Sequence, residues 1–375
     1  MVKKAILYIV ITILKFLANI VYLFMKLFPT KNRIIMITRQ SNNVTLDFRL
    51  LKEYIEKTDN NIEIKIFAKK LEKGIYNKIL YILYTLKVMK HLATSKVCVI
   101  DSYCIPVSIL KHKKKLKIIQ IWHASGAVKK FGHQILNKKE GSSAYIAKLM
   151  CMHKNYDFVI APSERTKKIF AEAFNIQEEK IVKFGLPRLE YICNSKYDKS
   201  KEILAEYPDL KNKKNILYIP TFRKNQNTNL EEILKYKIDK QKYNLIISLH
   251  PLDSTKVPDE YLVNKKFSSF DLIKIADYII TDYSALSIEA SVLEKPIFIY
   301  LYDYDNYKEN RGLNIYLNEE LKTFTTTKFS DIMTKIEEKN YDIKELIDYK
   351  NKYIEINPES SIEDLGNFLL KQIRE

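Results

Sequence analysis

The sequence is poor in glycine, with seven in 375 residues. None of the seven belongs to a G-x-G-x-x-G or G-x-x-x-x-G-K-[ST] pattern, in which glycines let a backbone loop surround a phosphate chain. Dinucleotide-dependent dehydrogenases and P-loop nucleotide hydrolases are therefore disfavoured. Any nucleotide that binds this chain should be held by helix amino termini and side chains.

Cysteines and acidic residues are also scarce. The four cysteines, Cys98, Cys104, Cys151 and Cys193, show no C-x-x-C spacing, which indicates a reduced, cytosolic setting without structural zinc. Lysine and arginine number 63 against 45 aspartates and glutamates, so the formal charge is +18. This surplus predicts polyanionic partners, which are nucleic acid, anionic lipid headgroups or phosphorylated substrates.

One long apolar run, residues 5–28, has the length needed to cross a bilayer. Polar residues interrupt it every three or four positions, so they share one narrow helix face; they are Lys4, Tyr8, Thr12, Lys15, Asn19, Tyr22 and Lys26. We expect residues 1–29 to form a retained helix in the membrane interface, with its cations toward the headgroups. The alternatives are a membrane span and a helix packed against protein.

After Pro29 the sequence alternates between short apolar strands and amphipathic helices. In the first half, strands are predicted at 33–38, 62–67, 96–101, 117–122, 157–163 and 180–185, and helices at 45–57, 77–93 and 164–175. This alternation is typical of a doubly wound parallel sheet.

The same alternation restarts after a lysine-rich polar stretch, residues 190–212. Strands are predicted at 215–222, 244–251, 278–284 and 296–300, with helices at 229–237, 285–294 and 329–339. Ser360 and Glu363 form a capping-box pattern before a last helix, residues 361–373. We therefore expect an α/β protein with two Rossmann-like domains, residues 30–192 and 193–360, facing a cleft as in GT-B transferases, followed by a C-terminal helix at 361–375.

The clearest phosphate-binding candidate is YIITDYSALSIEASVLEKP, residues 278–296, where a helix opens directly after a buried strand. Unpaired N–H groups and the helix dipole at such a start suit a diphosphate. Ser284 and Ser287 can add hydroxyl donors, and Glu289 can accept from a ribose hydroxyl. The alternative is an ordinary helix cap made by Asp282 or Ser284.

Two further strand ends in the second half carry polar groups. The segment SLHP places His250 where it can donate to a phosphate oxygen or protonate a leaving group. The segment IPTFR places Thr221 and Arg223 at another strand end, and a guanidinium suits bidentate phosphate contact. A structural histidine and a surface arginine are the alternatives.

In the first half, IWHASGAVKKFGHQ (residues 121–134) puts His123 at the end of a strand, where a neutral imidazole can take a proton from an acceptor hydroxyl. Gly126 permits close approach of substrate to the backbone, and Lys129 can attract a phosphorylated acceptor. A second loop, TRQSNN, offers Arg39, Gln40 and Ser41 to sugar hydroxyls. The alternative for this second loop is a solvated helix cap.

Two weaker signals are given little weight. Asp303 and Asp305 form a D-x-D pair, but it lies in a tyrosine-rich segment past its strand, so we expect no metal site. The basic run at 111–117 lacks interleaved aromatic residues, so we expect no nucleic-acid binding. No resident cofactor is expected either.

Together these segments resemble the CDP-glycerol glycerophosphotransferase family of teichoic acid synthesis. The resemblance is carried by ITRQSN (37–42), QIWHASGAVKKFG (120–132), APSERTKKIF (161–170), FGLPRLE (184–190), YIPTFR (218–223), LHP (249–251), ADYIITDYSALSIEA (276–290) and the arginine-glycine pair at 311–312. It implies a GT-B fold, peripheral attachment to the cytoplasmic face of the membrane, and transfer of glycerol phosphate from CDP-glycerol with release of CMP.

The tryptophan-histidine-alanine form resembles the primases of that family. Primases add the first glycerol phosphate to an undecaprenyl-diphosphate-linked N-acetylmannosaminyl-N-acetylglucosamine disaccharide. Ser125 is a small departure, because primases commonly have alanine there. The resemblance implies that His123 and His250 are the essential histidines, that Thr281, Asp282, Tyr283 and Ser284 form the nucleotide-phosphate loop, and that Arg311 is the arginine before glycine.

Four alternatives to a glycerol-phosphate primase stay open. The chain could be a polyol-phosphate polymerase or ribitol-phosphate transferase of the same family, or a GT-B glycosyltransferase that uses a sugar nucleotide. A non-catalytic basic protein bound to anionic membrane is the alternative of another class. It predicts salt-sensitive binding without CMP release.

Overall fold

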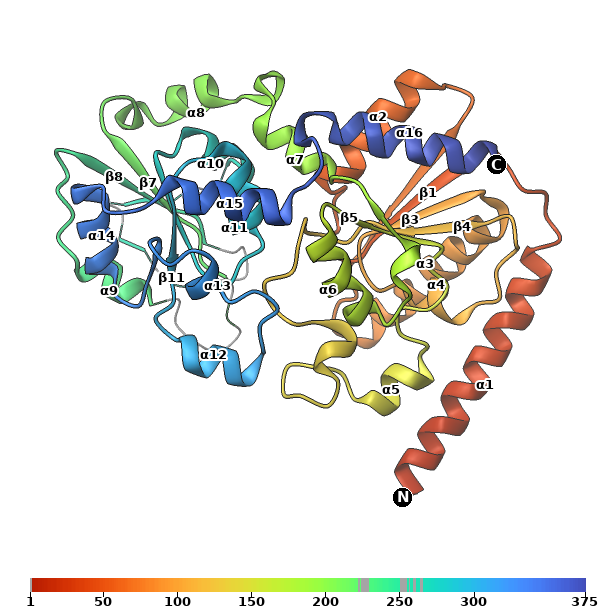
Figure 1. The fold of residues 1–375 in the computed structure, drawn as a ribbon. Coiled ribbons are helices and arrows are strands. Elements are labelled where there is room, and N and C mark those ends of the chain that lie inside the picture. Colours follow the sequence, from red (N-terminus) through yellow and green to blue (C-terminus); the bar gives the residue numbers. More distant parts are fainter. Residues whose placement is uncertain are drawn as a thin grey trace. The chain divides into compact units, whose positions relative to one another are not determined.

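The computed structural model describes residues 2–221, 223, 229–249, 255, 257–258, 261–263 and 266–375 (Figure 1). The chain forms two compact units. Unit 1 comprises residues 1–123, 131–187 and 360–375, and unit 2 comprises residues 124–130 and 188–359. The sequence-based boundary after residue 192 therefore falls inside helix α7 (Pro187–Cys193), which begins at the junction of the two units.

Unit 1 is built on a six-stranded parallel sheet in the order β2-β1-β3-β4-β5-β6. The strands are β1 (Arg33–Thr38), β2 (Glu63–Ala68), β3 (Val97–Ile100), β4 (Lys117–Gln120), β5 (Phe158–Ala161) and β6 (Ile181–Lys183). The helices are α2 (Leu46–Thr58), α3 (Ile75–Thr94), α4 (Ile105–Ile109), α5 (Ala144–Leu149) and α6 (Glu164–Phe174). The four central strands, β1, β3, β4 and β5, are mostly apolar, and all their residues are buried except Lys117 and Phe158 at the first positions of β4 and β5, as expected when helices cover both faces of a parallel sheet.

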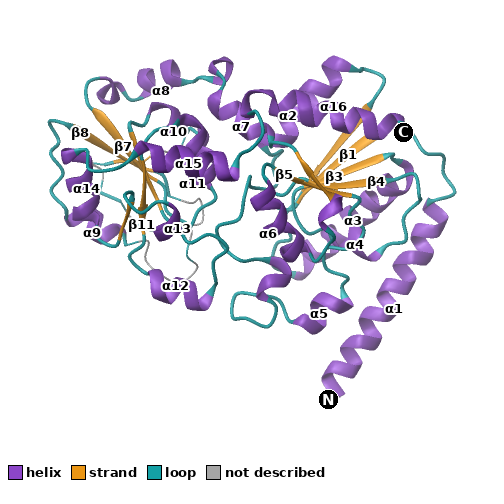
Figure 2. Cartoon of the chain, in the orientation of Figure 1, coloured by secondary structure: helices purple, strands orange, loops and turns teal. Residues whose placement is uncertain are grey.

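Unit 2 contains a second parallel sheet with helices around it (Figure 2). This sheet has six strands, in the order β12-β11-β10-β7-β8-β9. Its strands are β7 (Lys214–Tyr218), β8 (Tyr243–Ile247), β9 (Leu262–Val263), β10 (Tyr278–Thr281), β11 (Ile297–Tyr300) and β12 (Thr325–Thr326). The helices are α8 (Ser200–Glu206), α9 (Leu230–Lys235), α10 (Ser269–Ile275), α11 (Leu286–Ala290), α12 (Tyr304–Asn310), α13 (Leu317–Glu320), α14 (Phe329–Glu338) and α15 (Ile343–Tyr353). The predicted α/β class with two parallel sheets is confirmed.

The strand orders locate the loops where ligands bind in such folds. Ligands of doubly wound sheets bind at the carboxyl ends of the strands, where the strand order reverses. In unit 1 this reversal lies between β1 and β3, which are neighbours with β2 on the outer side of β1. In unit 2, which has the Rossmann strand order, the reversal lies between β7 and β10.

The last helix, α16 (Ser361–Arg374), returns to unit 1 and packs against α2, although the two are far apart in the sequence (Figure 1). Gly366 permits this close packing, because a Cβ there would lie 2.3 Å from the Tyr54 ring. The predicted capping box is not formed: the Ser360 hydroxyl donates to Asp364 instead, at 2.6 Å.

The amino-terminal helix α1 (Val2–Met25) is oriented differently from the sequence-based prediction. Lys15 donates to the Leu149 carbonyl at 2.8 Å, Asn19 donates to the Ile109 carbonyl at 3.2 Å, and the Tyr22 hydroxyl lies 2.9 Å from Nδ1 of His112. Lys26 donates to the Lys111 carbonyl at 3.0 Å. This part of the polar stripe faces unit 1, and not the lipid headgroups as predicted, because its amide and ammonium groups complete backbone acceptors of the fold.

The opposite face of α1 is apolar and exposed. Among the described residues, one segment, Ala5–Met25, is long and apolar enough to cross a membrane by length and composition, and 6% of it is buried. The exposed side chains include Ile9, Ile13, Phe16, Leu23 and Phe24.

Candidate functional site

The carboxyl ends of β1, β3 and β4 meet around His123 in unit 1. The His123 Nδ1 atom lies 3.1 Å from the Asp101 carbonyl oxygen and 3.3 Å from Nε2 of Gln40. A carbonyl oxygen only accepts, so we assign the His123 proton to Nδ1, donating to Asp101. The contact with Asp101 is the shorter of the two. The Gln40 contact is compatible with this assignment, because the nitrogen and oxygen of a glutamine amide can exchange places. The lone pair of the imidazole then lies on Nε2.

Aromatic packing sets the position of this imidazole. Trp122 has a positive φ of 60°, which is uncommon outside glycine and turns the chain sharply after β4. Its ring lies 4.0 Å from the His123 ring and stacks on Phe131 at 4.5 Å, measured between centroids. The Trp122 amide donates to the buried Gln120 side chain at 2.8 Å. The only tryptophan therefore holds His123 at the strand end.

The predicted acceptor loop after β1 lies beside His123. Arg39 is anchored through its backbone N–H to the Ser102 hydroxyl at 3.3 Å and through Nη1 to the Tyr103 carbonyl at 2.8 Å. Gln40 approaches His123 directly, whereas the Ser41 hydroxyl accepts from the Asn43 amide at 2.9 Å and so closes a local turn. These contacts bring Gln40 and His123 together and hold Arg39 against the loop that follows β3.

In unit 2 the strand-order reversal brings together the ends of β7 and β10. The Asp282 carboxylate accepts from the Thr221 amide at 2.9 Å and from Arg223 Nη1 at 2.7 Å. Both side chains of the Asp282–Arg223 pair are at most 4% exposed. Three predicted site residues, Thr221, Arg223 and Asp282, therefore form one buried network.

The Arg223 guanidinium is surrounded by protein groups. Nε and Nη2 donate to the Asp303 carboxylate at 2.9 and 3.1 Å, and Nη1 also donates to the Thr221 carbonyl at 2.9 Å. The rings of Tyr283, Tyr302 and Tyr307 lie 5.0 to 5.6 Å from the guanidinium carbon. Burial alone would lower the pKa of Arg223, but the two carboxylates outweigh it and raise the pKa above its ordinary value. This arginine is a permanent cation that ties β7, β10 and the segment after β11 together.

The remaining groups of the β10 loop are largely engaged within unit 2. The Thr281 hydroxyl donates to the Ile219 carbonyl at 2.8 Å, and the Tyr283 hydroxyl donates to Asp303 at 3.1 Å. Ser287 is fully buried, and its hydroxyl donates to the Ser284 carbonyl at 2.9 Å. The Ser284 hydroxyl accepts from the Leu286 amide at 3.2 Å, directly before α11.

The segment that directly follows His123 belongs to unit 2. The Ser125 amide donates to the buried Glu289 carboxylate at 3.0 Å, and Arg188 donates to the same oxygen at 3.1 Å. The Val128 carbonyl accepts from the Asn314 amide at 2.8 Å. Residues 124–130, which contain Gly126, are thus held by α11 and by the chain after α12.

Lys129 and Arg311 are brought near each other by backbone pairing. Lys129 pairs with Leu313 in an antiparallel bridge, and the Lys130 amide donates to the Gly312 carbonyl at 3.0 Å. Gly312 has a φ of 80°, which an L side chain rarely adopts, and it ends α12 directly after Arg311. Arg311 and the loop after His123 therefore form one surface of unit 2.

Two predicted features need separate mention. His250 lies outside the described residues. In the part of the chain that the structure describes, no group of three or more His, Cys, Asp or Glu is placed to hold a metal ion. Asp303 of the D-x-D pair is ion-paired with Arg223.

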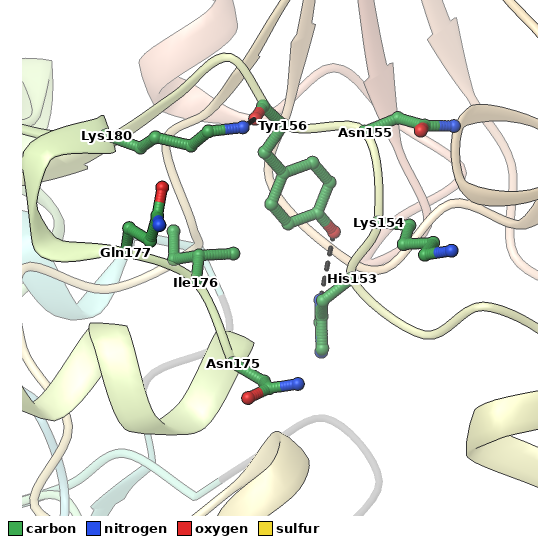
Figure 3. A pocket seen from close by; sticks show the side chains of 8 residues that line it. All are labelled: His153, Lys154, Asn155, Tyr156, Asn175, Ile176, Gln177 and Lys180. Carbon is green, nitrogen blue, oxygen red and sulfur yellow. Dashed lines mark hydrogen bonds between the residues drawn. The ribbon is translucent and has the colours of Figure 1, made fainter.

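Unit 1 also contains a cavity of about 440 Å³ at the amino ends of β5 and β6, away from the carboxyl-end loops (Figure 3). In Figure 3 the His153 and Tyr156 side chains point toward each other, and the His153 Nδ1 atom lies 2.9 Å from the Tyr156 hydroxyl. None of the predicted site residues lines this cavity. Burial lowers the pKa of His153 to about 3.

This buried histidine predicts a loss of stability in mild acid. The unfolded chain binds the His153 proton below about pH 6.5, whereas the folded protein excludes it until about pH 3, so stability is present above pH 6.5 and falls as the pH decreases. We expect a contribution of about 2 kcal/mol to be lost between pH 7.5 and pH 5. Chemical denaturation of wild type and His153→Asn at both pH values measures it, because asparagine tolerates the positive φ of 60° at this position. An equal pH slope in both proteins would contradict the assignment.

Comparison with known sequences identifies the family. Residues 20–371 match the model of the CDP-glycerol:poly(glycerophosphate) glycerophosphotransferases. The chain belongs to this family. It is therefore a transferase.

Two named relatives and one solved structure illustrate the likeness. The chain is 32% identical over 294 residues to the teichoic acid ribitol-phosphate primase of Bacillus spizizenii, covering 75% of each protein. It is 32% identical over 241 residues to the teichoic acid glycerol-phosphate primase of Bacillus subtilis, covering 62% of each. The wall teichoic acid polymerase TagF has a similar fold, with a TM-score of 0.75 at 19% identity over 99% of this chain and 97% of that one. The predicted family is confirmed, and the relatives are polyol-phosphate transferases of teichoic acid synthesis.

Sequence reasoning missed two kinds of residue at these sites. The Asp101 carbonyl orients His123, and Arg188 shares Glu289 with the Ser125 amide. A backbone carbonyl has no sequence signature. Arg188 lies in FGLPRLE, one of the segments that carry the family resemblance, but nothing in the spacing linked it to Glu289.

Proposed function

We propose that the protein is a teichoic acid primase that transfers glycerol phosphate from CDP-glycerol to an undecaprenyl-diphosphate-linked disaccharide. The family supports CDP-glycerol as the donor. The observation that carries the proposal is the position of His123, with Nδ1 donating to a carbonyl and the lone pair on Nε2, at a strand end beside Gln40. An imidazole oriented in this way is suited to act as a general base.

In the proposed reaction, Nε2 of His123 takes the proton of an acceptor hydroxyl while the hydroxyl oxygen attacks the β-phosphorus of CDP-glycerol. The new bond joins the acceptor oxygen to that phosphorus. The bond that breaks joins the β-phosphorus to the bridging oxygen, which leaves with CMP. Loose phosphoryl transition states depend mainly on positioning and on fixed positive charge.

We assign the donor side to unit 2, at the carboxyl ends of β7 and β10. Thr221 and Ser284 are the proposed contacts of the diphosphate, and Arg311 and Lys129 supply positive charge for it and for an anionic acceptor. His250 stays the predicted donor to the departing CMP phosphate. Arg223 takes a different role from the one predicted by its sequence position. With four N–H groups bound to protein acceptors, it supports the loop from within.

Membrane attachment follows from the proposed acceptor. A lipid-linked disaccharide is confined to the bilayer surface, so its enzyme gains from a permanent position there. The exposed apolar face of α1 is suited to enter the cytoplasmic leaflet, while its polar stripe holds the helix to unit 1. We therefore propose peripheral attachment at the cytoplasmic face of the cell membrane.

A second candidate donor, CDP-ribitol, is favoured by one observation. The match to the ribitol-phosphate primase extends over 75% of this chain, against 62% for the glycerol-phosphate primase, at equal identity. The donors CDP-glycerol and CDP-ribitol carry the same diphosphate and cytidine, so the described network around Asp282 does not discriminate between them.

A transfer assay tests the proposal. Detergent-purified full-length protein is incubated with a short-chain analogue of the lipid-linked disaccharide and with CDP-glycerol or CDP-ribitol, and CMP release and product mass are followed. We expect one glycerol phosphate per acceptor, because a primase does not extend its own product. One ribitol phosphate would establish the second donor, and long chains would indicate a polymerase. Absence of CMP with every CDP-polyol would contradict the proposal, and an assay without acceptor controls for hydrolysis.

A further inference from the structure

The large exposed apolar side chains of the described residues lie near the start of the sequence. Over the ranges that the structure describes, every large hydrophobic side chain in the exposed class lies before residue 87. Most belong to α1 and the two residues at 27–28, and a second group belongs to the first three turns of α3. Scattered apolar residues are ordinary on protein surfaces, but a continuous group marks an interaction site.

The second group forms a row along α3. Ile75, Ile79, Ile82 and Leu86 are 79, 53, 59 and 38% exposed. Their spacing of four, three and four residues places them on one face of the helix. Leu83, also exposed, broadens this row, which we call the α3 row.

The α3 row points away from the core of unit 1. The buried residues of α3 begin only at Val88, so the first two thirds of the helix contribute none. Its inner side carries Tyr84, whose ring lies 5.9 Å from the Phe67 ring of β2. The helix is thus attached to the protein on its tyrosine side and leaves the α3 row in water.

Lysines border the α3 row on both sides. At about 100° per residue, Lys78 and Lys87 lie on opposite flanks of the row, each about a quarter turn from its centre. Both are exposed. Long lysine side chains at the edge of an apolar face place their ammonium groups at the level of lipid headgroups.

The two exposed apolar faces belong to neighbouring helices. α1 and α3 pack against each other within unit 1. At their junction the Lys90 ammonium lies 6.0 Å from the Phe28 ring. From this contact and the flanking lysines we infer that α3 is a second lipid-binding helix, and that the α3 row enters an anionic bilayer together with the apolar face of α1.

The flanking charge favours lipid over a second copy of the chain. Two copies that met through their α3 rows would bring Lys78 and Lys87 of both chains close together, and the chain already carries a net charge of +18. An anionic membrane surface attracts the same lysines. This attraction needs no acceptor substrate, so the α3 row binds lipid whether or not the protein transfers polyol phosphate.

The test measures binding of the full-length protein to vesicles of phosphatidylcholine with 30% phosphatidylglycerol. One variant replaces the α3 row (Ile79→Ser, Ile82→Ser, Leu86→Ser), and a matched variant replaces three apolar residues of α1 (Ile13→Ser, Leu17→Ser, Phe24→Ser). A control variant, Glu231→Ser with Lys235→Ser, removes an exposed ion pair of unit 2 without changing net charge. We expect the α3 variant to bind about 100-fold more weakly than wild type, because three apolar side chains no longer enter the bilayer.

A charge variant separates the electrostatic contribution to vesicle binding from the apolar one. Lys78→Gln with Lys87→Gln should lower the affinity by about fivefold per lysine on vesicles that contain phosphatidylglycerol, and leave binding to pure phosphatidylcholine unchanged. Far-ultraviolet circular dichroism of each variant controls for folding.

Two outcomes would overturn the inference. One is an α3 variant that binds vesicles as well as the wild type while the α1 variant does not. The other is an α3 variant that turns a dimer into a monomer in light scattering with vesicle binding unchanged, which would make a second copy the partner of the α3 row. Neither readout requires transferase activity, so a failure here and a failure of the proposed function are distinguishable.

Discussion

Replacement of His123 by alanine is expected to lower the rate of polyol-phosphate transfer by about 10² to 10⁴-fold, the range that general bases contribute. The effect should appear in kcat, because the imidazole acts on the proton that leaves during bond formation. The donor contacts proposed here lie on other residues, so calorimetric titration should give the wild-type affinity for CDP-glycerol. Steady-state CMP release with the lipid-linked acceptor analogue measures the rate.

His133 provides the matched control for this prediction. Like His123, it is half-buried in unit 1 and lies close to a backbone carbonyl, 3.2 Å from that of Met152. His133→Ala should therefore keep the wild-type rate. If His123→Ala also turned over at that rate, His123 would have no part in proton transfer. A loss confined to donor affinity would instead make it a binding residue.

Much of the fold was predictable because both sheets are parallel and covered on both faces. Such strands are short, continuous apolar runs, so the segments at 33–38 and 296–300 stand out in the sequence and correspond to β1 and β11. The two strands that were missed, β9 and β12, have two residues each and no distinguishing pattern. The loops after the strands were also predictable as ligand-binding sites, because ligands of doubly wound sheets bind where the strand order reverses, and this reversal follows from the topology.

The partners of polar side chains were not predictable from spacing. The polar stripe of α1 has the same periodicity whether it faces headgroups or protein. Its hydrogen bonds to the carbonyls of Leu149 and Ile109 show that it faces protein, and these partners have no signature in the sequence. In the same way, Arg223 and Asp282 each suited a nucleotide when considered alone. They are 59 residues apart in the sequence, and their mutual ion pair exists only once β7 and β10 are adjacent.

Replacement of Arg223 by methionine is expected to lower the free energy of unfolding by about 3 to 5 kcal/mol. Methionine keeps much of the side-chain volume, but it leaves the carboxylates of Asp282 and Asp303 in the interior without their counter-charge. Chemical denaturation followed by circular dichroism measures the change. Because the Asp282 carboxylate also accepts from the Thr221 amide, the same variant should bind CDP-glycerol more weakly.

The ion pair between Lys214 and Asp277 is a matched control at the other end of β7. The Lys214 ammonium nitrogen lies 2.8 Å from the Asp277 carboxylate, but the two side chains are 62 and 30% exposed. Lys214→Met should therefore lower the free energy of unfolding by less than about 1 kcal/mol. Adding Asp303→Asn to Arg223→Met should restore part of the lost stability, because one uncompensated charge is removed. If Arg223→Met were as stable as Lys214→Met and lost only donor affinity, the guanidinium would be a direct ligand of the diphosphate. A large loss of stability with partial rescue means that Arg223 acts through the β7 and β10 loops that it holds together.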